Sequence, residues 1–202
     1  MFTPQVASER YQRAKYLTLE RFISYFFQIK EAAALPIASI LEIGIGNGLV
    51  AACLRQLGYQ VTTCDFDVSV KPDLVADVRQ LPCADGAFDL VMACQILEHL
   101  PWAEVPAAVR ELARATKKYA LVSLPRRHTG FQAVLKVPGM QTLFKRPYLD
   151  LSMLIPLKFP GFAESGQHHW EIDGWQTSLR DVKEKFAEDF VVKKVFSPPL
   201  NK

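Results

Sequence analysis

The chain has 202 residues, of which 50% are hydrophobic and 22% are charged, and its formal net charge is +3. This composition is typical of a soluble globular domain with one full core, and so small a net charge is no argument for nucleic-acid binding. No apolar run is long enough to cross a membrane, and the N-terminal residues lack the basic start and apolar stretch of a signal peptide. We therefore predict a single cytoplasmic domain over residues 1–202. The cysteines lack Cys-x-x-Cys spacing, which favours free thiols: Cys53, Cys64, Cys83 and Cys94.

The first element predicted along the chain is a helix over residues 8–33. Apolar and aromatic residues recur there at helical spacing, among them Leu19, Phe22 and Phe26. We expect this face to dock on a sheet or to fold over the mouth of a binding site. A partner-binding face is the alternative.

A strand that runs directly into a glycine-rich loop is the most informative feature of the sequence. Residues 39–43 read as a short buried strand, and an apolar helical pattern begins at Leu49. Between them, glycines allow sharp turns and a close approach to a ligand, beside the free N–H groups of a helix N-terminus. A dinucleotide fingerprint would place its third glycine at Leu49. The observed Glu-x-Gly-x-Gly-x-Gly spacing is instead typical of a loop that binds S-adenosylmethionine: Glu42, Gly44, Gly46 and Gly48.

Acidic residues follow the next two predicted strands. Asp65 ends the second strand, at the edge of the sheet where ligands bind in open α/β folds. Its carboxylate could accept hydrogen bonds from both ribose hydroxyls, and Phe66 beside it could cover an adenine face. Asp77, followed by Val78, ends a short third strand and could accept the adenine amino group.

The remaining core elements alternate in the same way. A turn at Asp85 and Gly86 leads into a fourth buried strand that ends at Cys94. A helix begins at Pro101, with proline tolerated in its first turn. The later predicted elements are a fifth strand over 119–124, a last helix from about Thr177, and a sixth strand over 190–196.

In sum, residues 39–124 resemble the class I S-adenosylmethionine-dependent methyltransferases, in particular the type 11 group. The motifs that carry the resemblance are LEIGIGNG at 41–48, CDFD at 64–67, ADVRQLP at 76–82, DGAFDLVMACQILEHLP at 85–101 and YALVSLP at 119–125. The resemblance implies a Rossmann-like, doubly wound α/β fold with a mostly parallel, seven-stranded sheet and flanking helices. It also implies that S-adenosylmethionine is bound by Glu42, Gly44, Gly46, Asp65, Asp77 and Val78, to which we add Gly48, Phe66 and Gln95.

The chain departs from this family after the fifth strand. Residues 126–176 form a long insertion, rich in basic and apolar residues, which we predict to be a substrate lid. A basic, apolar lid suits an anionic or lipid-like substrate, or docking on a membrane surface. Residues 177–202 contain the last helix and strand, but two prolines near the end cannot serve a central seventh strand. That strand is therefore predicted to be missing or truncated.

Two clusters could carry the chemistry. Glu98 and His99 follow Gln95 after the fourth strand, near the expected position of the methyl donor, and His168 and Glu171 precede the last helix. In a subset of O-methyltransferases that includes quinone-biosynthesis and small-RNA enzymes, a Glu-x-x-Glu-His motif at the first place binds a divalent metal. Here the first glutamate is Gln95, so we predict no metal site. We expect His168 to act as general base, held in place by Glu171.

The function predicted from these features is S-adenosylmethionine-dependent methyl transfer to a small or lipid-like acceptor, with oxygen as the favoured target. One alternative is a metal-assisted RNA 2′-O-methyltransferase, against which stand Gln95 and the modest charge. Another is a non-catalytic protein that binds the cofactor and acts through its N-terminal helix and lid.

Overall fold

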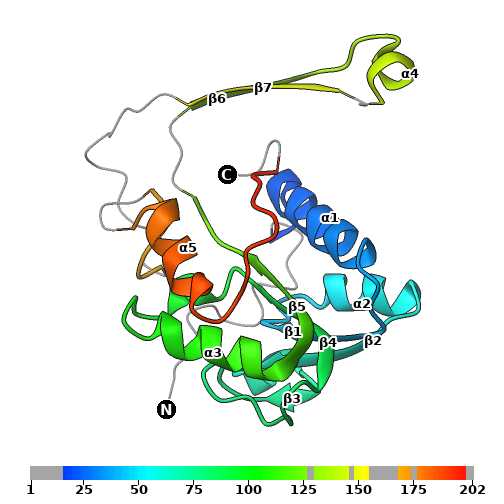
Figure 1. Ribbon diagram of the computed structural model, residues 1–202. Helices are drawn as coiled ribbons and strands as arrows, with labels where there is room; N and C mark the ends of the chain where they lie inside the picture. Colours follow the sequence, from blue (N-terminus) through cyan, green and yellow to red (C-terminus); the bar gives the residue numbers. More distant parts are fainter. Residues whose placement is uncertain (1–15, 127–129, 146–147, 155–167, 174–176, 199–202) are drawn as a thin grey trace.

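The computed structural model describes residues 16–126, 130–145, 148–154, 168–173 and 177–198 (Figure 1). Its centre is a parallel five-stranded sheet in the order β3-β2-β1-β4-β5. The strands are β1 (Ser39–Ile43), β2 (Gln60–Asp65), β3 (Leu74–Val75), β4 (Phe88–Cys94) and β5 (Thr116–Ser123). This order confirms the predicted Rossmann-like α/β fold.

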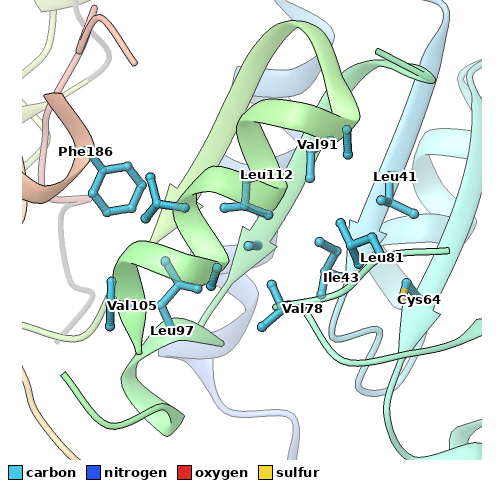
Figure 2. Packing of buried hydrophobic residues seen from close by; sticks show 14 of the residues in the cluster. Leu41, Ile43, Cys64, Val78, Leu81, Val91, Leu97, Val105, Leu112 and Phe186 are labelled. Atoms are coloured by element: carbon cyan, nitrogen blue, oxygen red, sulfur yellow. The ribbon is translucent and has the colours of Figure 1, made fainter. Parts of the chain in front are cut away.

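Helices cover both faces of the sheet because the strands are apolar on both sides. On β4, Leu90 and Met92 pack toward α1 (Leu19–Ala33) and α2 (Leu49–Gln56). Val91 and Ala93 point to the opposite face, where α3 (Val105–Ala115) and α5 (Leu179–Ala187) lie. Figure 2 shows this second cluster, with Phe186 on one side of Leu112 and the strand residues Val91, Ile43 and Leu41 on the other.

The predicted helix over residues 8–33 is not helical at residues 17 and 18, and α1 begins at Leu19. Thr18 has an extended backbone and is the N-cap of α1, because its side chain accepts a hydrogen bond from the Arg21 N–H at 3.4 Å. Hydroxyl residues favour this position, where they satisfy a free helical N–H. Residues 8–15 lie outside the described part of the chain. The last helix matches its prediction, since Ser178 and Asp181 form a capping box at the start of α5.

The predicted sixth strand over residues 190–196 was wrong, because the structure has no strand there. The segment runs beside α1 instead, where Lys194 Nζ donates to both carboxylate oxygens of Glu31 at 2.6 and 2.8 Å. The ring of Phe196 also packs on Phe27, with centroids 5.6 Å apart. A strand needs a neighbour for its backbone hydrogen bonds, and among the described strands β5 pairs only with β4.

The insertion after β5 has two different parts. β6 (Gly130–Leu135) and β7 (Leu149–Leu154) form an antiparallel hairpin, with α4 (Met140–Phe144) between them. Figure 1 shows this hairpin standing apart from the central sheet. The end of the insertion returns to the core, where the Ile172 N–H donates to the Pro125 carbonyl at 3.0 Å and Arg126 pairs with Asp173. Residues 127–129, 146–147, 155–167 and 174–176 of the predicted lid lie outside the described residues, so the lid remains a prediction.

Helices η3 (Val68–Val70) and η4 (Leu97–His99) are single 3₁₀ turns that follow β2 and β4. None of the helices in the described ranges has both the length and the apolar character that crossing a bilayer requires.

Candidate functional site: a glycine loop, buried acids and a histidine pair

The loop after β1 follows a path that requires glycine. Gly44, Gly46 and Gly48 have φ values of +78°, +53° and +71°, in the left-handed region that residues other than glycine rarely adopt. A Cβ on Gly44 would overlap the side chain of Ile96, which lies in the segment after β4. Gly48 is the N-cap of α2 and offers no side-chain hydrogen bond to the helix. Asn47 in the loop caps the helix instead, because its Oδ1 accepts a hydrogen bond from the Leu49 N–H at 3.2 Å.

Asp65 at the end of β2 holds this loop in place. One carboxylate oxygen accepts a hydrogen bond from the Ile45 N–H at 3.1 Å, and the other accepts from the Asp67 N–H at 3.0 Å. Burial raises the pKa of Asp65 above its ordinary value, although these two backbone donors act against the shift. Since a carboxylate offers about four acceptor positions, two remain for the hydroxyls of a ligand. The side chain of Phe66, beside it, is half exposed.

Asp77 is part of an ion-pair network that the sequence did not reveal. The Arg79 Nε and backbone N–H both donate to one Asp77 oxygen at 2.8 Å, and this pairing lowers the pKa of Asp77. Arg79 also pairs with Glu104, at the start of α3. The segment after β3 is thereby tied to α3. Val78 between the two partners is buried.

Glu42 is a buried acid at the end of β1. Its side chain is only 6% exposed, and its Oε2 has no hydrogen-bond partner among the described residues. Burial raises the pKa of Glu42 to about 8, against the opposing charge of Arg55. A buried, unpaired carboxylate oxygen is costly, so this atom is a candidate partner for a cationic or hydrogen-donating ligand.

These residues share one cavity of about 1350 Å³, which opens at the carboxyl ends of the strands and extends along β5 to residues 190–198. The predicted cofactor residues that line it are Glu42, Gly44, Gly46, Asp65, Phe66, Asp77, Val78 and Gln95. Gly48 does not line it, and acts at the α2 N-terminus instead. Gln95 has a φ of +59°, an uncommon backbone for a non-glycine residue and one that occurs often at functional sites.

The four predicted catalytic residues lie together in space, although the pair Glu98 and His99 is about 70 positions from the pair His168 and Glu171 in the sequence. The ring centroids of His99 and His168 are 5.0 Å apart, and His168 Nδ1 lies 2.8 Å from Glu171 Oε1. Glu98 is fully buried, and neither of its carboxylate oxygens has a partner among the described residues. Burial, with a smaller contribution from the charge of Glu171, raises the pKa of Glu98 to about 8. Side-chain atoms of Glu98, His99 and His168 that can bind a metal all lie within 4.8 Å of one another.

Backbone and tryptophan contacts hold this cluster together. The His169 N–H donates to the Glu98 carbonyl at 2.8 Å, and Trp170 Nε1 donates to the Leu100 carbonyl at 3.1 Å. Trp170 is buried against Trp102 with ring centroids 4.7 Å apart. Sequence reasoning missed this role of Trp170, whose only local signal is an aromatic residue beside two histidines.

Comparisons with known proteins find similarity over part of the chain. The family model of the methyltransferase domain matches residues 41–124. A ubiquinone biosynthesis O-methyltransferase from Xanthomonas campestris pv. campestris (strain B100) is 35% identical over 83 residues, which cover 34% of this chain and 35% of that protein. A malonyl-[acyl-carrier protein] O-methyltransferase from Buchnera aphidicola is 36% identical over 95 residues, covering 42% and 37%. The chain spans little more than a third of the length of these curated relatives.

Solved structures superpose on about half of the chain at low similarity. The YcgJ protein from Bacillus subtilis superposes with a TM-score of 0.43 at 24% identity, covering 51% of each chain. An S-adenosylmethionine-dependent methyltransferase from Methanosarcina mazei gives a TM-score of 0.40 at 19% identity, covering 57% of this chain and 61% of that one.

The buried state of Glu42 predicts a pH-dependent stability. An unfolded glutamate has a pKa of about 4.3, whereas folded Glu42 titrates at about 8. Between these values the native state holds a proton that the unfolded state releases, so the free energy of unfolding falls as pH rises from 4.3 to 8. Urea unfolding should be measured at pH 5 and pH 8 for wild type and Glu42→Gln. Between these pH values the free energy of unfolding should fall less in the variant than in wild type, by roughly 2–5 kcal/mol. Glu188→Gln, at an exposed position, is the control, and its free energy of unfolding should fall as much as that of wild type. An equal fall in all three proteins would contradict the raised pKa of Glu42.

Proposed function

We propose that this chain, whose residues 41–124 are a class I methyltransferase domain, transfers a methyl group from S-adenosylmethionine to an oxygen of a small or lipid-like acceptor. One observation carries the proposal. The glycine loop and the acids after β1, β2 and β3 converge on a single cavity, and the histidine cluster adjoins it through His99. Since the domain covers under half of the chain, the remainder must supply the choice of acceptor.

The residues present fit the cofactor. The glycine loop allows the cofactor to approach the backbone closely, and Asp65 keeps acceptor capacity for the ribose hydroxyls. Phe66 is exposed enough to stack on an adenine face, and Asp77 lies one strand further along the same edge. Glu42 offers a buried acceptor for the amino group, which would satisfy its unpaired oxygen. When bound, the cofactor supplies an electrophilic methyl group on a sulfonium centre.

His168 suits the role of general base. Because Glu171 Oε1 lies 2.8 Å from Nδ1, the carboxylate favours a proton on that nitrogen and leaves Nε2 to accept one from an acceptor hydroxyl. The carboxylate also fixes the orientation of the ring. Alignment of the acceptor oxygen with the methyl group then provides the larger part of the rate, as in other displacement reactions within a bound complex.

An oxygen acceptor agrees with the names of the relatives. The ubiquinone biosynthesis and malonyl-[acyl-carrier protein] enzymes are both O-methyltransferases. A nucleic-acid acceptor has less support, since the net charge of the chain is only +3.

Metal-assisted methyl transfer is a second candidate because of one observation, the convergence of Glu98, His99 and His168. Two imidazoles and a carboxylate are a donor set that suits a divalent transition metal. A bound ion would also compensate the buried Glu98 charge. It would serve as a Lewis acid toward the acceptor oxygen. Our sequence-based expectation of no metal therefore needs a direct test.

Cofactor binding should depend on Asp65. Asp65→Asn keeps the shape of the side chain but removes the charge that receives the ribose hydroxyls, so calorimetry should show affinity for S-adenosylmethionine weakened by about 2–4 kcal/mol. Asp85→Asn is the control, because Asp85 is exposed on a turn remote from the cavity lining. Failure of wild type to bind S-adenosylmethionine would contradict the proposed function, and unchanged binding by Asp65→Asn would remove this residue from the site.

Turnover should depend on His168 more than cofactor affinity does. His168→Ala removes the base that acts on the acceptor, so kcat should fall by roughly 10²–10⁴-fold, while the affinity for S-adenosylmethionine stays near wild type. Arg180→Ala, at an exposed residue of α5 that does not line the cavity, is the comparison and should keep most of the activity. Full activity of His168→Ala would exclude His168 as the general base and leave it a role in packing alone.

Chelation distinguishes a base from a metal ligand. If His168 acts as a base alone, dialysis against a chelator should leave the rate of methyl transfer unchanged. Loss of the rate, with recovery on adding a divalent cation to wild type but not to Glu98→Gln, would establish the metal-assisted mechanism instead.

A further inference from the structure

The hairpin of β6 and β7 exposes an apolar face. Leu135 lies opposite Leu149 in the antiparallel register, and Leu151 follows two residues along β7. Residues directly opposite one another, or two apart on one strand, share a face of the ribbon. All three leucines are 37–48% exposed. One face of the hairpin therefore presents leucine side chains to the surroundings.

The outer end of the hairpin also exposes apolar side chains. Val137 follows β6, and Phe144 at the end of α4 is 66% exposed. Figure 1 shows α4 between the two strands, at one end of the hairpin. An isolated two-stranded ribbon is only marginally stable in water, and exposed apolar side chains grouped on a protruding element mark a contact site.

The charges on the hairpin identify the kind of surface that it fits. Lys136 and Lys145 flank the outer end and are both exposed. From residue 130 to residue 151 the sequence has three basic residues, Lys136, Lys145 and Arg146, and a single acid, Asp150. A ribbon with leucine on one face, an aromatic residue at its end and lysines beside it matches the chemistry of an anionic lipid surface, which offers both an apolar interior and negative headgroups.

We propose that the hairpin, residues 130–154, docks on anionic membranes. Leu135, Leu149, Leu151 and Phe144 enter the headgroup boundary, while Lys136 and Lys145 contact lipid phosphates. The sequence-based expectation was membrane contact through the whole lid, and the proposal now assigns this contact to one face of the hairpin. The proposal does not depend on the proposed methyltransferase activity, because none of these residues belongs to the catalytic cluster.

Vesicle co-sedimentation of the full chain tests the proposal. Wild type should sediment with vesicles of phosphatidylcholine mixed with phosphatidylglycerol, more weakly with phosphatidylcholine alone, and less as salt is added. Phe144→Ser and the double change Lys136→Glu with Lys145→Glu should each weaken binding by roughly tenfold or more. The controls are Leu57→Ser, at an exposed leucine after α2, and Lys117→Glu, at an exposed lysine of β5; both should bind as wild type does.

Three outcomes would overturn the proposal. The first is wild type that fails to sediment with either vesicle, and the second is a loss of binding in the controls as large as in the hairpin variants. In the third, sedimentation equilibrium would show self-association that Phe144→Ser abolishes, which would make the apolar face an interface between copies of the chain. Calorimetric titration of each variant with S-adenosylmethionine separates these outcomes from a failure of the cofactor site. Thermal unfolding checks that each variant keeps its core.

Discussion

Gly44 lies so close to Ile96 that any side chain at this position would overlap it, and this contact fixes how the ends of β1 and β4 meet. The loop after β1 can rest against the segment after β4 only because glycine has no Cβ and accepts a left-handed backbone. Asp65 then joins β2 to the same point through the Ile45 N–H. Gln95, immediately before Ile96, has a left-handed backbone of its own. Glycine at position 44 is thus a packing requirement as well as a means of bringing backbone N–H groups near a ligand.

The closeness of these segments has an electrostatic consequence. Glu42 and Glu98 follow the same two strands, and both are buried with carboxylate oxygens that lack partners among the described residues. Burial raises the pKa of each to about 8, so both carboxyl groups hold a proton through much of the neutral range. Such groups destabilise the fold in comparison with apolar residues of similar size. These two buried carboxyl groups therefore mark the part of the structure where a cationic ligand group or a metal ion would be bound most favourably.

The sequence predicted the features whose signals are local. A strand, three glycines and a helix within 16 residues, followed by acids at strand ends, fixed the parallel core and the residues of its cavity. What it did not predict depends on distant partners. The pairing of Arg79 with Asp77 and Glu104 joins two elements, and Asp65 holds a loop as well as facing a ligand. Residues 190–196 have strong strand propensity, yet propensity cannot supply the neighbouring strand that a ladder requires; side-chain contacts with α1 decided the outcome there.

The long insertion after β5 combines an anchored end with a protruding middle. Three backbone or indole hydrogen bonds, from His169, Trp170 and Ile172, fasten its end to the segments that follow β4 and β5. His168 is therefore placed by the core, with Glu171 beside it, and its geometry does not depend on the hairpin. The hairpin, by contrast, has a leucine face and an aromatic tip that the described core does not cover. Because the two parts are fastened differently, the hairpin can bind a surface without displacing the histidine.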